Sequence, residues 1–252
     1  MKRVQEDSHT LLQIQMIKSE HPFWGYRRVW AYIKYRLNQP VNKKRIYRIM
    51  KENNLMVMPN LRLKATRDNQ AYKSKPKAHR LHQFWGTDMT KVLLNDFGWL
   101  YLVIVLDWYS KKIVGYSISS HSRTEDWLNA LHDACNKQFP QGILSKTEEL
   151  YLVSDNGSQP TSHNYMQACS VLEIKQIFAS YNNPKGNADT ERVMRTIKED
   201  FVWVRAFASP TEFTEAFKQW VDDYNNDYPH SSLSYRTPCQ FEKEQLLLTT
   251  KN

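Results

Sequence analysis

The sequence predicts an α/β fold, in which a mixed five-stranded sheet is flanked by helices and preceded by a small basic helical module. Hydrophobic residues follow a helical period up to about residue 55 and a strand period from residue 82 onward. Charge divides near the same place: residues 21–80 hold 16 basic and two acidic residues, whereas residues 81–252 hold 16 basic and 21 acidic ones. This division favours a cationic module that binds a polyanion, joined to a body with another task; a solvated basic surface is the alternative.

Composition excludes several classes of protein. The 252 residues, 41% hydrophobic, suffice for one large domain or two small ones. No apolar run approaches the roughly 18–20 residues that span a bilayer, and the N-terminus lacks the apolar segment of a secretory signal. Three scattered cysteines have no metal-ligand spacing. A membrane protein, a secreted scaffold and a zinc finger are therefore not expected; we expect a cytoplasmic protein, associated with the nucleoid when bound to DNA.

The basic module, residues 1–55, has the pattern of a helix-turn-helix. We expect one helix over residues 21–37, a break at Pro40, and a second helix over 43–54 with Asn42 as its N-cap. Such a pair presents cations to DNA from its second helix. The candidate DNA-binding residues there are Lys43, Lys44, Arg45 and Arg48. A helical hairpin that packs on the body is the alternative, and whether the module reads bases or grips only phosphates stays open.

A basic linker over residues 56–80 leads to a core domain over residues 81–245, with a tail at 246–252. The expected strands cover 82–94, 98–107, 111–120, 151–155 and 174–180, and the expected helices cover 124–139, 163–172, 188–204 and 211–225. Beyond residue 225 we expect irregular structure. Three strands, a helix, a strand, a helix, a strand and further helices are compatible with a ribonuclease H-like core.

Three acidic residues occupy positions that indicate chemistry. Asp88 lies within an apolar strand, Asp155 ends a strand before an Asn-Gly turn, and Glu191 lies near the start of a helix. If the first and fourth strands are neighbours, Asp88 and Asp155 come together, and Glu191 needs only a helix at the same edge. Clustered carboxylates without His or Cys favour Mg²⁺, or Mn²⁺ as its substitute. Two such ions about 3.5–4 Å apart serve in-line phosphoryl transfer. Asp107 is a further candidate acid, although a turn-capping role is the more favoured interpretation.

The helix that carries Glu191 adds two cations to this group. At 100° per residue, Arg195 and Lys198 share a face with Glu191 within about 60°. A separate apolar stripe is suited to the core: Val193, Met194, Ile197, Phe201 and Val204. The face with Glu191 would grip phosphate beside a metal, and ordinary surface charges are the alternative.

Several segments resemble a known family. They read HPFWGYRRVWAYI, DWYSKKIVGYSIS, SDNGSQ, NPKGNADTERVMRTIKED and YNNDYPHSSLSYRTPCQF. They are similar to the second-reading-frame product (OrfB) of insertion-sequence-three family bacterial transposases, and the three acids resemble the DDE signature of retroviral-type integrases. The resemblance spans about residues 21–241.

This resemblance implies a ribonuclease H-like catalytic core that uses divalent metal for donor-strand cleavage and strand transfer. It implies that Asp88, Asp155 and Glu191 form the metal-binding triad. The DNA-contacting positions implied by the helix and the adjacent loops are Lys198, Arg195, Asn156, Lys185 and Asn187. Expected partners are the element's terminal repeats, target DNA and further copies of the chain.

The N-terminus departs from the family pattern. Family transposases act as fusions with an upstream product (OrfA) that supplies a leucine zipper, and no heptad run is present here. An upstream partner or fusion is therefore expected. Two alternatives remain: a catalytically silent DNA-binding remnant, or truncated copy, that represses transposition, and a structure-specific nuclease on the same core.

Overall fold

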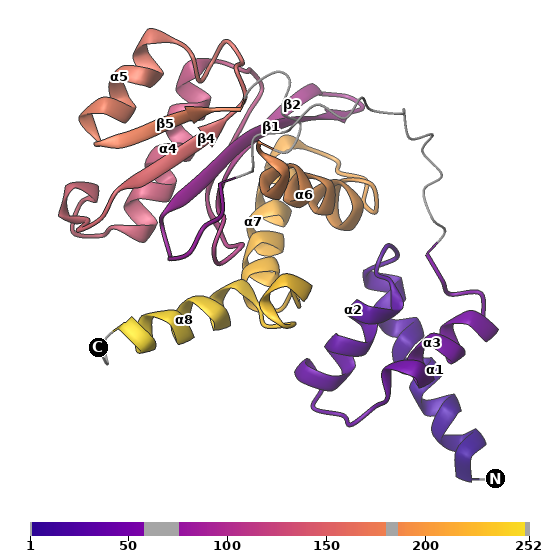
Figure 1. The fold of residues 1–252 in the computed structure, drawn as a ribbon. Helices are drawn as coiled ribbons and strands as arrows, with labels where there is room; N and C mark the ends of the chain where they lie inside the picture. Colours follow the sequence, from indigo (N-terminus) through magenta and orange to yellow (C-terminus); the bar gives the residue numbers. More distant parts are fainter. Residues whose placement is uncertain (1, 58–75, 180–185, 250–252) are drawn as a thin grey trace, which may run out of the picture. The chain divides into compact units, whose positions relative to one another are not determined.

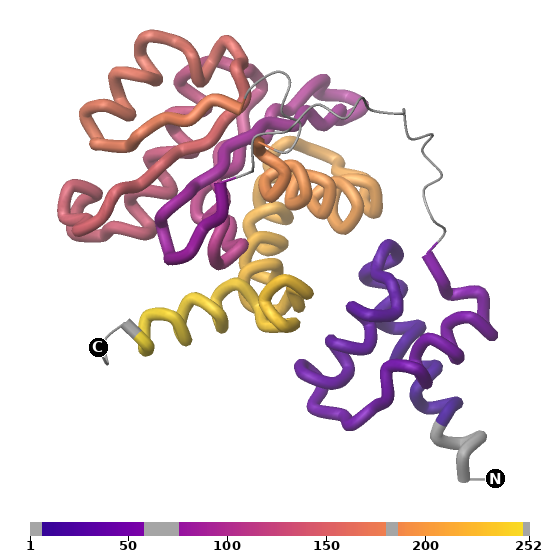
Figure 2. The backbone as a smooth tube through the Cα atoms, in the orientation of Figure 1, coloured from indigo at the N-terminus to yellow at the C-terminus, as the bar shows by residue number. Residues whose placement is uncertain are grey.

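The computed structural model describes residues 2–57, 76–179 and 186–249, with side chains described from Asp7 onward. The chain divides into two compact units (Figures 1 and 2). One unit comprises Met1–Gln70 and Asn226–Thr237, and the other comprises Ala71–Asn225 and Pro238–Asn252.

The second unit is built on a five-stranded mixed sheet. Its strands are β1 (Phe84–Leu94), β2 (Gly98–Asp107), β3 (Ile113–Ser119), β4 (Leu150–Ser154) and β5 (Ile174–Phe178). Their order in the sheet is β3-β2-β1-β4-β5. The first three strands are antiparallel neighbours, whereas β4 pairs in parallel with both β1 and β5. The central strand β1 is therefore the point at which the sheet changes from antiparallel to parallel.

Helices cover both faces of this sheet (Figure 1). They are α4 (Thr124–Gln138), η2 (Ile143–Ser145), α5 (His163–Val171), α6 (Ala188–Ile197), η3 (Lys198–Val202), α7 (Pro210–Asn226) and α8 (Pro238–Thr249). Helices α4 and α5 pack over one face, around the buried side chains of Trp85, Val103 and Val105. Helix α4 approaches β3 so closely that a Cβ at Gly115 would lie 2.5 Å from the backbone nitrogen of Ala134. A glycine is thus required for this helix to rest on the strand.

Helices α6 and α7 pack over the opposite face. Phe217 of α7 meets the ring of Tyr116 on β3, with ring centroids 5.1 Å apart. The buried ring of Phe201, in the π-helical turn η3, packs against Phe213 and Phe217 at 5.3 and 5.4 Å. The turn at η3 closes with the amide of Trp203 donating to the carbonyl of Lys198 at 2.9 Å. This aromatic cluster holds the C-terminal end of α6 against α7.

The first unit is a bundle of short helices. They are α1 (Lys2–Glu20), α2 (Tyr26–Ala31), η1 (Tyr32–Arg36) and α3 (Lys43–Glu52). Their shared core contains fully buried Ile14, Ile33 and Ile46. The side chain of Asn42 accepts a hydrogen bond from the amide of Lys44 at 2.8 Å and so caps α3, as the sequence predicts.

A distant segment of the chain completes the first unit. The ring of Tyr228 meets that of Trp24 edge-on, with centroids 5.5 Å apart, and the guanidinium of Arg28 lies 4.4 Å from the Tyr228 ring centroid. Tyr235 meets the ring of Trp30 at 5.4 Å. A short 3₁₀ turn, η4 (Ser231–Leu233), lies between these two tyrosines.

The expected strands and central helices are confirmed to within one or two residues at most ends. Four expectations were wrong. The helix expected over residues 21–37 begins only at Tyr26 and becomes the π-helical turn η1 at Tyr32. Residues 2–20 form a helix where none was predicted, since its apolar residues do not form a broad stripe. The chain beyond residue 225 was expected to be irregular but forms α8. The predicted helix 188–204 changes at Lys198 into a π-helical turn, which the α-helical period does not anticipate. Most of the expected linker lies outside the described residues.

Candidate active site

Strands β1 and β4 bring two of the predicted acids together. Phe84 pairs with Tyr151 and Gly86 with Val153 in the parallel register. Continuing that register by two residues brings Asp155 level with Asp88, just past the end of β4. The sequence argument required the first and fourth strands to be neighbours, and they are. Both residues therefore lie at the edge where β1 continues and β4 has ended.

Helix α6 brings the third acid to the same face. The side-chain amide of Asn187 donates to the backbone carbonyl of Thr87 at 3.1 Å, and the indole nitrogen of Trp108 donates to the hydroxyl of Thr190 at 3.0 Å. Both bonds are buried. Because Thr190 directly precedes Glu191, these bonds place the first turn of α6 against the strand that carries Asp88.

The absence of a side chain at Gly86 allows this contact. A Cβ there would lie 2.0 Å from the Thr190 hydroxyl and 2.3 Å from the Trp108 indole nitrogen. Gly86 and Asp88 lie two residues apart on β1 and point to the same face. Glycine on the strand is therefore a condition for the helix to reach the acid.

Electrostatics show that the predicted residues act on one another. Burial, together with the carboxylates of Asp155 and Glu191, raises the pKa of the Asp88 carboxyl to about 6. The hydrogen bond from the Met89 amide, 2.8 Å long, and the charge of Lys198 oppose that rise in pKa. Two further acids and one cation thus lie near enough to Asp88 to affect its pKa.

The donor set suits a hard divalent cation. All three acids offer carboxylate oxygens, and their mutual repulsion is the charge excess that such an ion relieves. Asp155 and Glu191 are exposed, and Asp88 is partly buried. Across the part of the chain that the structure describes, no three His, Cys, Asp or Glu side chains lie close enough together to hold a metal ion. The carboxylates of Asp88, Asp155 and Glu191 are thus the right ligands for such a cation. To bind one ion together, the three side chains must move closer to one another.

The other predicted residues of this region have different environments. Arg195 on α6 is exposed, and Lys198, the first residue of η3, is half-buried; both lie away from buried Val193, Met194 and Ile197. The side-chain amide of Asn156 donates to the backbone carbonyl of Ala179 at 3.3 Å. Asn187 is buried, and its amide nitrogen is bonded to Thr87 rather than offered to solvent. Lys185 lies outside the described residues.

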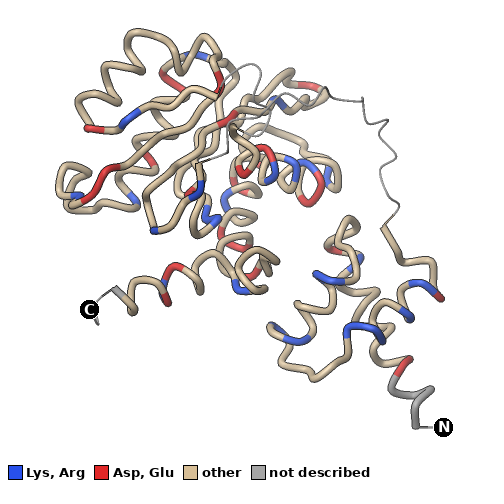
Figure 3. The backbone as a smooth tube through the Cα atoms, in the orientation of Figure 1, with Lys and Arg blue, Asp and Glu red and all other residues tan. Residues whose placement is uncertain are grey.

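The predicted cations of α3 separate into two groups. Lys43 and Lys44 are exposed, and the Lys43 ammonium lies 5.1 Å from the ring centroid of Trp30. Arg45 and Arg48 each form an ion pair with Asp7 at 2.7 Å. These two arginines tie α3 to α1. Lys and Arg positions predominate on the helices of this unit in Figure 3.

Asp107 belongs to a turn rather than to the acidic cluster. Its fully buried carboxylate accepts hydrogen bonds from the amides of His82, Tyr109 and Ser110 at 2.7 to 2.9 Å. It also accepts one from the Ser110 hydroxyl at 2.9 Å. The favoured interpretation, a turn-capping acid, is confirmed.

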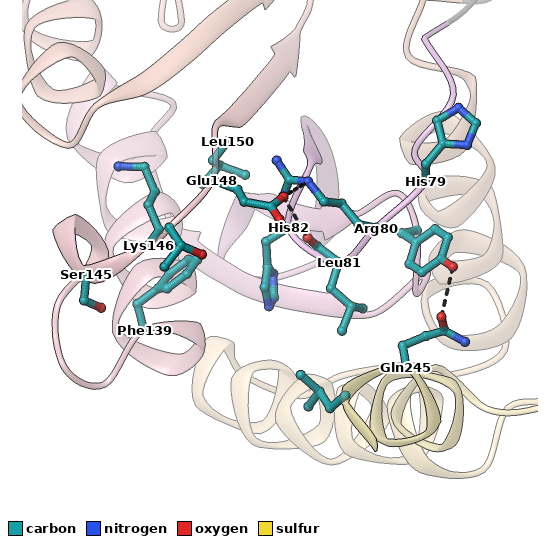
Figure 4. A pocket seen from close by; sticks show the side chains of 13 residues that line it. His79, Arg80, Leu81, His82, Phe139, Ser145, Lys146, Glu148, Leu150 and Gln245 are labelled. Atoms are coloured by element: carbon teal, nitrogen blue, oxygen red, sulfur yellow. Dashed lines mark hydrogen bonds and ion pairs between the residues drawn. The ribbon is translucent and has the colours of Figure 1, made fainter. Parts of the chain in front are cut away.

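A cavity of about 450 Å³ opens at the other ends of the same strands (Figure 4). Its lining includes His79, Arg80 and His82 before β1, and Lys146 and Glu148 before β4. Arg80 is held by the carbonyl of Glu149 at 2.7 Å and by an ion pair with Glu148. Because Asp155 follows the C-terminal end of β4, this cavity is separate from the acids and does not supply the candidate active site.

The sequence argument did not identify the supports of the acidic cluster. Gly86, Trp108 and Thr190 lie far apart in the sequence, and none of them interrupts a period or completes a ligand pattern. Only their contact in space shows their role. A glycine two residues before a strand acid was the single local signal available.

Three family models match the chain. A model described as "Integrase core domain" matches residues 78–184, and a second with the same description matches residues 172–238. A model described as "HTH-like domain" matches residues 5–62. With the sheet order above, these matches define an integrase core of the ribonuclease H-like class, preceded by a helix-turn-helix-like domain.

Relatives narrow this class. The chain is 23% identical over 245 residues to transposase InsD for insertion element IS2A/D/F/H/I/K of Escherichia coli, covering 95% of this chain and 80% of the relative. Transposase InsD for IS2-9 of Escherichia coli K12 is equally similar, covering 78% of the relative. The chain is a transposase of the IS3 family, homologous to these InsD proteins and within the retroviral integrase superfamily.

A solved structure has a similar fold. The chain aligns with a chain of the simian T-cell lymphotropic virus intasome in complex with PP2A regulatory subunit B56 gamma, at a TM-score of 0.54 and 13% identity. The alignment covers 91% of this chain and 74% of that one. Separately, none of the helices in the described residues is long and apolar enough to cross a membrane.

Proposed function

We propose that this chain catalyses metal-dependent cleavage and strand transfer of DNA at the ends of an insertion sequence. The proposal is supported by the parallel pairing of β1, which carries Asp88, with β4, which ends just before Asp155, and by the buried hydrogen bonds that hold the first turn of α6, with Glu191, against β1. The integrase core matches and the InsD relatives support the reaction class.

Each residue of the group has a role in this reaction. Asp88, Asp155 and Glu191 would hold Mg²⁺, or Mn²⁺ in its place, with two ions in the DNA-bound state. When bound, the metal activates the attacking oxygen and stabilises the leaving oxygen. Lys198, which already interacts with Asp88, offers its ammonium to the phosphate at the reacting end. Arg195 lies one turn away on the same face and extends the cationic surface along the strand.

Cleavage and joining are two displacements at phosphorus. In the first, water attacks the phosphodiester at the element's end, the bond to the 3′ oxygen breaks, and a 3′ hydroxyl forms. In the second, that hydroxyl attacks a target phosphodiester, so one phosphoester bond forms as another breaks and no external energy source is needed. The same carboxylates serve both steps because both are in-line displacements.

The partners follow from the two units. We propose that the helix-turn-helix-like domain binds the terminal repeats, that the core acts on those ends and on target DNA, and that several copies assemble on DNA with an upstream OrfA product. We place this activity in the cytoplasm, at the nucleoid. Exposed Lys43 and Lys44 supply cations for DNA phosphates.

Nicking of supercoiled plasmid in Mn²⁺ tests the proposal. The wild type should nick, Glu191→Gln should not, and both should bind DNA with similar affinity. Glu215→Gln is the matched control, since Glu215 is an exposed acid on α7 of the same unit. Equal nicking by wild type and Glu191→Gln would contradict the triad. DNA binding by a wild type that does not nick, alone or with OrfA, would instead support a silent DNA-binding protein.

A further inference from the structure

The turn that follows β2 contacts the helix that carries Glu191. Trp108 is the first residue after β2, and its backbone amide donates to the carbonyl of Phe84 at 2.9 Å, at the start of β1. Its indole nitrogen donates to Thr190 at 3.0 Å. Three residues further on, Lys111 forms an ion pair with Asp189 at 3.2 Å. The turn thus joins β1 to the first turn of α6.

The turn itself is rigid. The buried carboxylate of Asp107 accepts hydrogen bonds from the backbone amides of Tyr109 and Ser110, which fix the backbone around Trp108. It also accepts one from the amide of His82, which ties the turn to the segment before β1. The Trp108 side chain is itself buried, at 2% exposure, and stacks on Phe84 with ring centroids 5.9 Å apart. Because the indole of Trp108 has little freedom to move, its hydrogen bond fixes the position of the Thr190 hydroxyl that accepts it.

A second bond fixes the other end of the same helical turn. Asn187, the N-cap of α6, donates to the carbonyl of Thr87 at 3.1 Å. Thr87 directly precedes Asp88, and Thr190 directly precedes Glu191. One buried hydrogen bond therefore ends on the neighbour of Asp88 and the other on the neighbour of Glu191, and at Gly86 the strand and the helix approach so closely that a Cβ would not fit between them.

We propose that Trp108 and Asn187 are positioning residues that hold Glu191 at the distance from Asp88 that shared metal binding requires. The inference rests on the proposed function. Neither side chain touches the reacting atoms; both act through the placement of α6. Because the backbone of α6 is fixed, convergence of the three acids on a metal needs side-chain rotation rather than movement of the helix.

Thr190→Val tests the Trp108 bond. Valine keeps the shape of threonine and removes the hydroxyl that accepts the indole hydrogen bond. We expect the Mn²⁺ concentration for half-maximal nicking to rise about five- to tenfold, as for loss of one hydrogen bond. Nicking at saturating Mn²⁺ should stay near the wild-type rate. Direct Mn²⁺ titration of the DNA-free protein, read by electron paramagnetic resonance, should show the same weakening.

Thr190→Ser is the matched control because it keeps the hydroxyl, and it should restore Mn²⁺ affinity. Trp108→Phe provides a second variant, which keeps an aromatic ring, although a smaller one, and removes the N–H donor. Asn187→Ala tests the other bond by the same titration. Thermal unfolding without metal gives the temperature at which each variant begins to unfold. The Mn²⁺ titrations are made below that temperature, so that every variant is folded.

The outcomes separate the two proposals. A wild type that neither nicks nor binds Mn²⁺ would overturn the proposed function. A wild type that nicks, with Glu191→Gln inactive and Thr190→Val and Trp108→Phe unchanged in Mn²⁺ affinity, would overturn only the positioning role. A loss of stability with unchanged Mn²⁺ affinity would likewise reduce these bonds to a structural role.

Discussion

At the scale of single residues, Asp88 makes stability depend on pH. Its pKa of about 6 in the folded chain compares with about 3.9 for an unperturbed Asp. An acid that holds its proton more tightly when folded favours folding at low pH, so this contribution is lost as pH rises from about 4 to about 6. The raised pKa corresponds to a loss of about 3 kcal/mol across that range.

Urea unfolding in EDTA between pH 4 and pH 7.5 measures this effect. The difference in unfolding free energy between wild type and Asp88→Asn should change by about 3 kcal/mol over that range and level off above about pH 7. At pH 7, added Mg²⁺ should raise the stability of the wild type but not that of Asp88→Asn. Parallel pH profiles of the two proteins would contradict the assigned burial and charge environment of Asp88.

Sequence reasoning at this scale found groups with recognisable chemistry and missed their supports. Asp88 and Asp155 stood out because an acid in an apolar strand, or at a strand end, has few other uses. Glu191 stood out because it shares a helix face with Arg195 and Lys198 and matches the third acid of the resembled family. Thr190 and Trp108 were not, since a buried threonine or tryptophan normally serves packing. Asn187 was expected at DNA, yet its amide is bonded to the backbone of β1.

At the scale of elements, the contact between β1 and α6 depends on a missing side chain. Gly86→Ala places a methyl group about where the Thr190 hydroxyl now lies, so α6 must move outward. Overpacking of this kind typically costs about 1–3 kcal/mol. We expect that loss together with loss of nicking, both measured against Gly25→Ala, where a Cβ meets nothing within 4 Å. A Gly86→Ala protein as stable and active as wild type would contradict this packing.

Helix α3 offers a second test at this scale. Lys44→Ala should weaken DNA binding about equally for all sequences and lower the slope of log affinity against log salt by about 1. Arg45→Ala should mainly lower the unfolding temperature of the first unit, because Arg45 pairs with Asp7 on α1. Salt titrations of fluorescent duplex binding distinguish the two. An equal change of slope in both variants would show that Arg45 also contacts phosphate.

The elements themselves were largely predictable. The strands and helices α4 and α7 have clear periods bounded by turn residues. Helices α1 and α8 were not predicted because tertiary contacts, rather than a pronounced apolar stripe, support them. The π-helical turn η3 accompanies the packing of Phe201 against Phe213 and Phe217 of α7, which no local pattern records.

At the scale of the whole molecule, two compact units with separate cores predict two unfolding transitions. Calorimetry should resolve them. Ile46→Ala, at a fully buried position, should lower only the transition of the first unit, by about 2–5 kcal/mol. Mg²⁺ should raise only the transition of the second unit. A single cooperative transition, shifted equally by both changes, would contradict independent units.

The division of charge along the sequence anticipated these two units. It did not anticipate that residues 226–237 join the first one. Contacts such as Tyr228 with Trp24 link positions about two hundred residues apart, and composition and periodicity describe only neighbours in sequence. The predicted boundary of the helical module, residues 1–55, concerns only the N-terminal segment of this unit and stays a prediction.

The close approach at Gly86 also bears on how copies of such an element decay. Glycine has four codons, and every missense change in their first or second base yields a residue that carries a Cβ. Each of these replacements would meet the Thr190 hydroxyl and the Trp108 indole. Codon 86 is therefore a place where one nucleotide change is expected to silence a copy while leaving all three acidic codons intact. Among related genomic copies, an unbroken DDE motif beside a replaced Gly86 would mark an element that has lost its mobility.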